Sequence, residues 1–461
     1  MIDCLTQEWL ATYRRSASLT DQPNYFVTTP ASLITQSTPV SYTLGNGHQI
    51  FTSSIIPACL ETQHELLLVT CFWAKSTTRD AITSLLRQLS EKAIARGDGK
   101  KIAVRLCFSS ISILQKLFQT SSLDGKVYDE KEWVGLGLPS QEEMRGLDLL
   151  VKSIFVRPFG IMHPKFVVVD REKSFMPSCN VSWESWFEGC VEMRGGICER
   201  LVDFYEDFWT RGSKKLDGSW IKEFVPSIKQ NNALEEGGLI GSRAFTRRDT
   251  EGRETVQTIL LPSQHHINPR FSPFSQSTAP PTPLNTFILT AISHARSSIY
   301  IQTPNLTSRP LMRALLAALK RSVAITITTS SNLMILEQLV TAFTITSYEI
   351  YKLQRAHAGL ISCHGSSDTE AQHPRPGDLR IRYFKEKDGG EGMDREEVVK
   401  SHLKLLIVDD EVTVLGSGNM DRASWFTSQE LGVAIIDEEF ARRVGQCTDE
   451  ALRGRVRLIN E

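Results

Sequence analysis

The sequence predicts an α/β fold made of two similar lobes, and two observations lead to this prediction. Apolar runs typical of buried strands alternate with amphipathic helical segments along the 461 residues, a pattern typical of mixed sheets flanked by helices. A polar motif that begins at His163 then recurs at His402, after the same order of elements. We therefore expect two lobes, each a mixed β-sheet flanked by helices, related by a pseudo-two-fold axis.

Each half begins with a strand, a helix and a second strand. In the first half we expect them at residues 65–73, 77–96 and 101–110, and in the second at 297–306, 309–321 and 323–331. The first helix carries one apolar face at helical spacing, formed by Ile82, Leu85, Leu86, Leu89 and Ala93. Strands that alternate with helices in this way favour sheets covered on their faces by helices.

A polar stretch that contains glycine, residues 231–254, marks the expected join between the halves. We therefore expect an N-terminal lobe, residues 1–235, with the first motif, and a C-terminal lobe, residues 250–461, with the second. Because one chain carries both motifs, a monomer is expected to suffice.

The composition is that of a globular protein without a strong electric field. Lysine and arginine total 52 against 53 aspartates and glutamates, a net charge of −1, so no overall basic charge draws the chain to nucleic acid. The nine cysteines form no Cys-x-x-Cys pair, which is typical of reduced thiols in an intracellular protein. Since neither a signal peptide nor a long apolar span is evident, we expect a cytoplasmic protein.

The sequence neither predicts nor excludes peripheral contact between the protein and an intracellular membrane. It would depend on the loop 263–284 or on the segment 334–355, which we expect to form a single helix with an apolar stripe. We expect this stripe to pack in the core, because such stripes do so more often than they anchor a protein to a membrane.

Two stretches carry the same polar side chains at identical offsets. They read HPKFVVVDREKSFMPSCN from residue 163 and HLKLLIVDDEVTVLGSGN from residue 402. The shared side chains are His163, Lys165, Asp170, Ser178 and Asn180 in the first and His402, Lys404, Asp409, Ser417 and Asn419 in the second. Because residues two apart on a strand face the same side, each motif directs an imidazole and an ammonium at one spot.

Each stretch is expected to fold as a β-hairpin that turns at Arg171–Glu172 or at Asp410–Glu411. This register sets each histidine opposite the asparagine, and each lysine opposite the serine, of its own motif. Two such hairpins that meet across the pseudo-two-fold axis would gather two histidines, two lysines, two serines and two asparagines in one cleft.

Such a cleft suits a phosphodiester substrate. Lysines, hydroxyls and amides can bind the non-bridging oxygens, and they bind more strongly as charge builds up in the transition state. One neutral imidazole can attack phosphorus to give a covalent phosphohistidine, while the other, protonated, gives a proton to the leaving alkoxide. This chemistry needs no metal or other cofactor, and the sequence contains no Cys/His or carboxylate set with metal-ligand spacing.

The pattern His-x-Lys-x4-Asp-x6-Gly-Ser-x-Asn, known as the HKD motif, resembles that of the phospholipase D superfamily, whose members carry it twice or dimerise to obtain two. The second motif matches in full, and the first differs by Pro177 in place of the glycine. The chain looks closest to fungal phospholipase D-like proteins and to the cardiolipin synthase type. This resemblance covers most of the chain and implies the two-lobed fold of the superfamily.

The resemblance also implies roles for the histidines and their neighbours. His163 is the expected nucleophile and His402 the expected general acid, although the likeness of the two half-sites leaves their order open. The family usually has a downstream acid that hydrogen-bonds a catalytic histidine. Glu192 and Glu430 fit this position, with Glu188 as the alternative in the first half.

The motif aspartates, Asp170 and Asp409, are counted with the catalytic set. They lie at the ends of strands, next to the turns, and we expect them to brace the hairpins.

The leading hypothesis is an enzyme that cleaves or exchanges a phospholipid phosphodiester. Transfer to water would make it a phospholipase D, and transfer to an alcohol a phosphatidyltransferase. A nuclease is the first alternative, disfavoured because the sequence shows no basic stripe with interleaved aromatic residues. A non-catalytic lipid-binding relative is the second, disfavoured because both motifs are chemically complete. The head group and the acceptor stay open.

Overall fold

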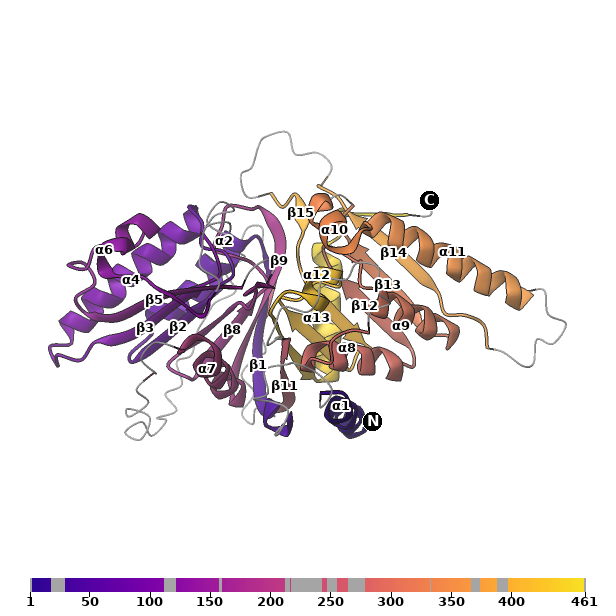
Figure 1. Ribbon diagram of the computed structural model, residues 1–461, viewed down its shortest axis with the longest axis horizontal. Helices are drawn as coiled ribbons and strands as arrows, with labels where there is room; N and C mark the ends of the chain where they lie inside the picture. The colour runs from indigo at the N-terminus through magenta and orange to yellow at the C-terminus, as the bar shows by residue number, and fades with distance from the viewer. Residues whose placement is uncertain are drawn as a thin grey trace.

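The computed structural model describes residues 2–17, 30–111, 122–156, 160–211, 216, 243–246, 255–263, 278–331, 333–365, 374–387 and 397–459. The expected lobe boundaries, residues 235 and 250, lie outside these ranges. Figure 1 shows two lobes side by side, each with a sheet and helices, and with β1, β9 and β11 between them. The prediction of a two-lobed α/β fold is confirmed.

The first lobe is built around a mixed sheet. Its strands, outward from the centre of the molecule, are β1 (Ile34–Gly45), β9 (Trp186–Gly195), β8 (Lys173–Pro177), β7 (Phe166–Val169), β2 (Glu65–Val69), β3 (Ile102–Phe108), β5 (Leu147–Val156) and β4 (Ser122–Val127). The longer helices are α4 (Thr77–Ala95) and α7 (Gly196–Trp209). Shorter elements are η1 (Pro30–Leu33), α2 (Gly47–Ile50), η2 (Phe51–Ile55), α3 (Ile56–Leu60), α6 (Glu130–Trp133), η3 (Val134–Leu136) and β6 (Gly160–Ile161).

The second lobe repeats this plan. Its strands, again outward, are β11 (Val256–Ser263), β18 (Glu430–Ile436), β17 (Val412–Gly416), β16 (Leu405–Val408), β12 (Ser298–Gln302), β13 (Ala324–Thr329), β14 (Leu379–Phe384) and β19 (Val456–Leu458). Its helices are α8 (Pro283–His294), α9 (Arg309–Lys320), α10 (Ile335–Ala342), α11 (Thr346–Gly365), α12 (Arg422–Phe426) and α13 (Glu438–Ala451). Two short strands, β10 (Arg243–Thr246) and β15 (Lys400–Ser401), pair with β1 and β9.

The pairing of β1 with β11 joins the two sheets. These strands run antiparallel, with Ile34 opposite Ile259 and Ser37 opposite Val256. An antiparallel pair has local two-fold symmetry, and on each side of it the strands follow in the same order and directions, except that the outermost strands, β4 and β19, come from different places in the chain. The pseudo-two-fold axis therefore passes through this pair, which fixes how the lobes face each other.

Both faces of the first sheet are buried, which explains the unbroken apolar run of β2. Leu66 and Leu68 belong to the core that includes the inner face of α4, whereas Leu67 and Val69 belong to the core that includes α7. Successive strand residues face opposite sides of a sheet, so a strand covered on both sides must be apolar throughout. The apolar face expected for residues 77–96 is buried as predicted.

The motif hairpins differ by one residue from the expected register. Val169 pairs with Lys173, and Val408 with Val412, so each turn contains three residues rather than two. Asp170 and Arg171 have φ angles of 48° and 55°, and Asp409 and Asp410 repeat this geometry, each with a φ of 54°. The histidines, lysines and asparagines lie beyond the paired strands, so the expected histidine–asparagine pairing within a hairpin is wrong.

The motif aspartates tie these turns to the neighbouring strands. The Asp170 carboxylate accepts hydrogen bonds from the backbone N–H groups of residues 63–65 at 2.7–2.8 Å. Asp409 accepts the equivalent bonds from residues 296–298 at 2.8–2.9 Å. Burial alone would raise the pKa of Asp409, but these donors lower it. Both aspartates therefore brace the hairpins at the ends away from the histidines.

The expectation of one helix over residues 334–355 is wrong. Phe343 has a left-handed backbone, with a φ of 53°, and ends α10, and α11 begins at Thr346 after a short break. The apolar side chains of α10 face outward instead of packing in the core.

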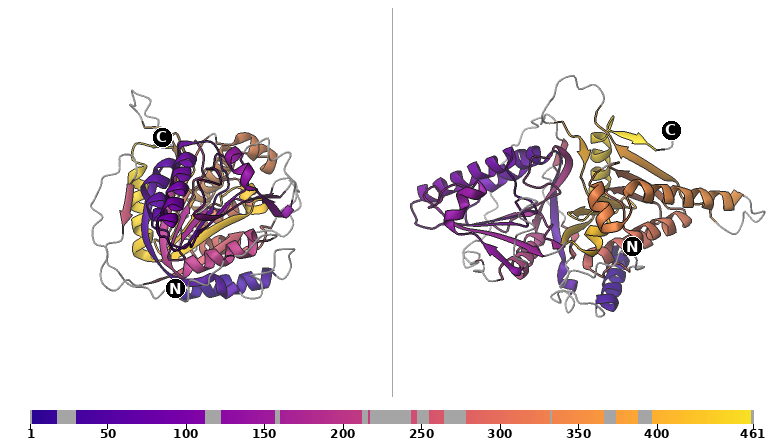
Figure 2. Two further views of the ribbon diagram at one scale, coloured as in Figure 1. Left: turned by 90° about the vertical axis from the view of Figure 1, so that its left-hand side faces the viewer. Right: turned by 45° about the horizontal axis from the view of Figure 1, so that its top comes forward.

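The N-terminal helix α1 (Ile2–Ala17) packs on the second lobe. Trp9 Nε1 donates to the Pro283 carbonyl at 3.2 Å, and its ring meets that of Phe287 edge-on. Figures 1 and 2 show α1 at the periphery of the molecule, beside α8. Among the described residues, no helix is both long enough and apolar enough to cross a membrane.

Candidate active site

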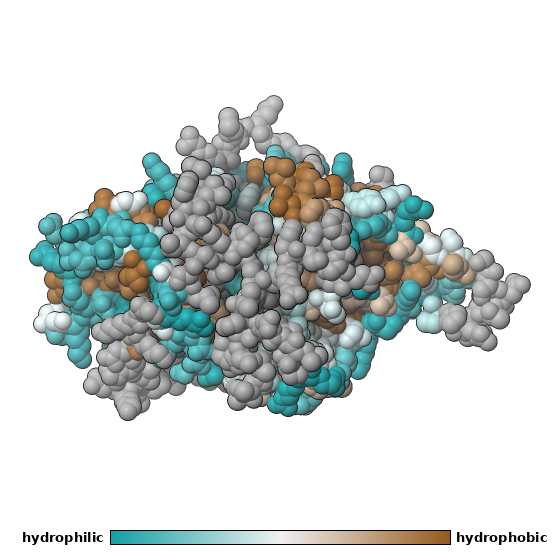
Figure 3. Space-filling model, in the orientation of Figure 1, coloured by the Kyte–Doolittle hydropathy of each residue, from teal (hydrophilic) through white to brown (hydrophobic). Residues whose placement is uncertain are grey.

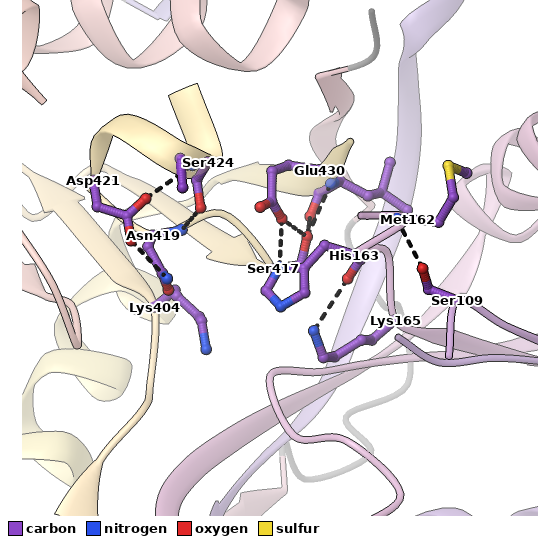
Figure 4. Close-up of polar contacts among 12 residues, drawn as sticks. Ser109, Met162, His163, Lys165, Lys404, Ser417, Asn419, Asp421, Ser424 and Glu430 are labelled. Carbon is purple, nitrogen blue, oxygen red and sulfur yellow. Dashed lines mark hydrogen bonds and ion pairs between the residues drawn. The ribbon is translucent and has the colours of Figure 1, made fainter. Parts of the chain in front are cut away.

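The two motifs meet where the lobes join. His163 and Lys165 lie just before β7, and His402 and Lys404 lie just before β16. Figure 4 shows His163, Lys165 and Lys404 turned toward one common space between the lobes. The charge of Lys404 acts on His163, and that of Lys165 on His402, which places all four side chains in one site.

His163 belongs to the first lobe but is held by the second. Its backbone N–H donates to the Gln429 carbonyl at 2.9 Å. Its ring Nδ1 lies 2.8 Å from Oε2 of Glu430, the next residue along the second lobe. The same carboxylate oxygen accepts a hydrogen bond from the Ser417 hydroxyl at 2.5 Å.

His402 belongs to the second lobe and is held by the first lobe in the equivalent way. Its backbone N–H donates to the Phe187 carbonyl at 2.9 Å, and its Nδ1 lies 2.6 Å from Glu188 Oε1. The Ser178 hydroxyl donates to the other oxygen of Glu188. Each lobe therefore supplies one histidine and the glutamate that orients the histidine of the other lobe.

A carboxylate beside Nδ1 determines where the imidazole carries its proton. A carboxylate only accepts, so Nδ1 of each neutral ring must be the protonated nitrogen. Nε2 is then left with its lone pair, on the side of the ring away from the glutamate. Both histidines are thereby prepared to act as nucleophiles or bases at Nε2.

Two buried lysines complete the polar centre. Lys165 Nζ donates to the carbonyl of His163 at 3.1 Å, and Lys404 Nζ donates to that of His402 at 2.6 Å. Lys404 Nζ also lies 2.8 Å from His402 Nδ1 and 2.9 Å from His402 Nε2. Each ammonium has three donors, so both lysines can also serve an anionic ligand.

Burial determines the charge states of both histidines and of Lys404. It lowers the pKa of His163 and lowers that of His402 to about 4, so both rings are neutral at neutral pH. It also lowers the pKa of Lys404 to about 7, helped by the charge of Lys165. Burial alone would raise the pKa of Glu188, but His402 and Lys404 bring it down to about 2.

The hydroxyls of the motif serines have other hydrogen-bond partners than expected. We expected Ser178 and Ser417 to contact a phosphate, but their hydroxyls donate to the two glutamates. Each hydroxyl also accepts a backbone N–H, that of Gly189 or Leu431. Because the only O–H of each serine is already used, these residues fix the glutamates in place.

Glu192 is not the partner of a histidine, and Glu188 takes that position. Glu192 lies four residues further along β9, roughly 13 Å away at the rise of a strand, and accepts a hydrogen bond from Ser41. The helix α12 adds three residues between Asn419 and Glu430 that the first lobe lacks, so counting from the asparagine misled the prediction. Each glutamate directly precedes the residue whose N–H donates to the motif serine, a relation that only the folded structure reveals.

The two asparagines are held differently. Asn419 Nδ2 donates to Asp421 at 3.0 Å, and Asp421 also accepts the Ser424 N–H at the start of α12. The first lobe has Ser182 at the matching place. The Oδ1 atoms of Asn180 and Asn419 are buried and have no hydrogen-bond partner among the described residues, so they remain available to a substrate.

Within the described ranges, no group of three or more histidine, cysteine, aspartate or glutamate side chains could hold a metal ion. All nine cysteines are free.

Comparisons with known proteins agree with this architecture. Residues 288–450 match the family model described as the cardiolipin synthase, PLD-like domain. The minor cardiolipin synthase ClsB of Bacillus subtilis is 31% identical over 85 residues, which is 18% of this chain. The chain spans about a fifth (21%) of the length of that relative.

Solved structures resemble the whole fold or one part of it. The phosphatidylserine synthase of Haemophilus influenzae is similar with a TM-score of 0.52 and 14% identity, over 92% of this chain and 89% of that one. Nuc of Salmonella typhimurium, a phospholipase D family member, has a TM-score of 0.26 and 18% identity, over 39% of this chain and 91% of its own. Residues 288–450 therefore resemble the PLD-like domain of cardiolipin synthases, and the whole chain shares its two-lobed fold with a phosphatidylserine synthase.

Proposed function

We propose that this protein is a phosphodiesterase or phosphatidyltransferase that cleaves or exchanges a phospholipid phosphodiester through a covalent phosphohistidine, without a metal ion. The observation that carries the proposal is the reciprocal pairing of His163 with Glu430 and of His402 with Glu188. It supports a site in which two Nε2 atoms and two ammonium groups surround one phosphate.

The exposure of the two rings favours His163 as the nucleophile. Its side chain is 16% exposed, whereas that of His402 is 4% exposed and packs against Trp186, with ring centroids 4.6 Å apart. His163 Nε2 attacks phosphorus and forms a P–N bond while the P–O ester bond breaks. The departing alkoxide takes a proton from His402 Nε2.

The second half of the reaction reverses these steps. Neutral His402 removes a proton from water or an alcohol, whose oxygen attacks the phosphohistidine, and the P–N bond breaks. Transfer to water gives a phosphatidic acid-type product, and transfer to an alcohol gives a new diester. Lys165 and Lys404 stabilise the charge on the non-bridging oxygens throughout.

The general acid acquires its proton when the substrate binds. His402 is neutral in the empty site, because burial lowers its pKa. A bound diester places a negative charge beside the ring, and a nearby anion raises the pKa of an imidazole. Substrate binding is therefore accompanied by proton uptake at His402.

The choice of a phospholipid rests on the related proteins and on charge. The matched family model is that of cardiolipin synthase, and the similar proteins include a cardiolipin synthase and a phosphatidylserine synthase. The near-neutral chain lacks the basic stripe of a typical nuclease. Nucleic acid and a non-catalytic role are the alternatives that the following test separates.

The test is turnover of bis(p-nitrophenyl) phosphate, phosphatidylglycerol and single-stranded DNA in EDTA, by wild type and by His163→Ala and His402→Ala. We expect hydrolysis or transfer of the lipid that survives chelation and falls by at least about 10³-fold in each variant. Preference for DNA would point to the nuclease. Activity that is lost in EDTA, or that persists in both variants, would contradict the proposal.

Glu188→Gln tests the orienting carboxylate, with Glu192→Gln as a matched control on the same strand. Removing the charge that holds His402 should lower kcat by about 10- to 100-fold, whereas Glu192→Gln should stay close to wild type. Steady-state kinetics with bis(p-nitrophenyl) phosphate measure both. The opposite ranking would show that the carboxylate partner has been misassigned.

The pH dependence of kcat/KM tests the low pKa of Lys404. Burial brings this pKa to about 7, so the ammonium loses its proton above that pH and no longer attracts the anionic diester. Because proton uptake at His402 already makes kcat/KM fall as the pH rises, we expect the slope to steepen above about pH 7, by up to about a further tenfold per pH unit. A slope that does not change up to the pKa of an ordinary lysine would refute this assignment.

A further inference from the structure

Helix α10 exposes an apolar surface on the second lobe. Its members, called here the α10 patch, are Ile335, Leu336, Leu339, Val340 and Phe343, which are between 37% and 79% exposed. Figure 3 shows this hydrophobic patch at the top of the molecule, over the position of α10 in Figure 1. Large apolar side chains gathered on one helix in this way mark an interaction surface more often than scattered ones do.

The arrangement of α10 is the reverse of an ordinary surface helix. Its buried side chains include Gln338 and Thr341, which are polar, while its outer side is apolar. Met334 and Phe343, at its two ends, have φ angles of 54° and 53°, a conformation that bulky residues rarely adopt. Met334 precedes α10 and Phe343 separates it from α11, and such strain tends to persist at functional positions.

Two exposed tyrosines of α11, each with a basic side chain over its ring, border the patch. Tyr348 and Tyr351, in the first turns of α11, are 54% and 52% exposed. Lys352 Nζ lies 5.0 Å from the ring centroid of Tyr348, and Arg355 Cζ lies 5.9 Å from that of Tyr351. The apolar side chains of α10 are followed by the tyrosines and basic side chains of α11. This order matches that of a bilayer, from the acyl chains to the head groups.

The segment 334–355 contains two cations, Lys352 and Arg355, which lie over the tyrosine rings, and two acids, Glu337 and Glu349. One of the glutamates, Glu349, is buried and bonded to Thr344 and Lys352. Basic side chains near a membrane surface are attracted to anionic lipids.

The patch also lies close to the active site. Gln338, on the buried side of α10, donates to Asn305 Oδ1 at 3.0 Å. Asn305 bonds to Asp421, which in turn accepts from Asn419, a residue with an atom available to the substrate. The buried side of α10 is therefore connected to Asn419 by a short chain of buried polar side chains.

We propose that the α10 patch docks the protein on an anionic phospholipid bilayer, with the apolar side of α10 in the acyl region and the tyrosines and cations of α11 among the head groups. The proposal rests on the proposed function in one respect: it explains how a diester still in a membrane reaches the site.

The experiment compares Leu336→Asp/Val340→Asp with wild type and with a control, Val134→Asp. Val134 is 64% exposed on the first lobe, between Leu336 at 79% and Val340 at 52%, so the control adds one aspartate at a comparably exposed apolar position. Binding is measured by co-sedimentation with phosphatidylcholine vesicles, with and without phosphatidylglycerol, and folding by thermal unfolding. Turnover of bis(p-nitrophenyl) phosphate reports the site without a membrane.

We expect wild type and the control to bind the vesicles that contain phosphatidylglycerol, and the double variant to bind at least about tenfold more weakly. Turnover of the soluble diester should be equal in all three proteins, and turnover of vesicle phosphatidylglycerol should fall with binding. Patch-dependent vesicle binding without any diester turnover would support the docking surface and refute the proposed function.

Three results would overturn the docking surface. The first is that the wild-type protein does not bind the anionic vesicles. The second is that the double variant is folded and binds them as well as the wild-type protein does. The third is a wild-type dimer that the double variant converts to a monomer, because the patch would then be covered by a second copy of the chain.

Discussion

The hydrogen bond between His163 and Glu430, with its counterpart between His402 and Glu188, joins the lobes at the place where a substrate would bind. Each bond is reinforced by one backbone contact across the same junction. Neither lobe holds a complete half-site, because each lacks the carboxylate for its own histidine. The site exists only when the β1–β11 pair has set the two sheets in register.

The rest of the scaffold keeps this junction rigid. Each histidine precedes a short buried strand, and at the other end of that strand an aspartate binds three backbone N–H groups. The motif serines lock the glutamates in the same way, through one hydroxyl donor and one backbone donor. The polar residues of the motifs therefore divide into those that face the substrate and those that hold them in position.

A symmetric scaffold here carries an asymmetric site. Asp421 fixes Asn419 in the second lobe, whereas the first lobe has Ser182 at that place. His402 is more deeply buried than His163 and packs against Trp186. The two histidines therefore lie in different surroundings, as the proposed division into a nucleophile and a general acid requires.

Much of this architecture follows from the sequence, because its signals are local or repeated. Three features were predicted because each is formed by residues that lie close together in the chain. They are the apolar face of α4, the unbroken apolar run of β2 and the two motifs. The hairpin register was not, because the turns use Asp170 and Arg171 in a conformation that usually calls for glycine.

Contacts between distant segments were harder to predict. Glu188 could not be separated from Glu192 by counting, since both point to the same face of β9 and only the position of the opposite lobe selects between them. The exchange of glutamates between lobes is likewise a property of the assembled molecule. The break between α10 and α11 depends on the left-handed backbone of Phe343, which its residue type does not favour.

The most direct measurement of the central claim is nitrogen NMR of the imidazoles in histidine-labelled protein, for wild type, Glu188→Gln and Glu430→Gln. The account predicts two neutral rings protonated at Nδ1 in wild type at neutral pH. Glu188→Gln should then alter the signals of His402 alone, and Glu430→Gln those of His163 alone. A change in the histidine of the same lobe as the substitution, or no change in either ring, would contradict the exchange on which the site depends.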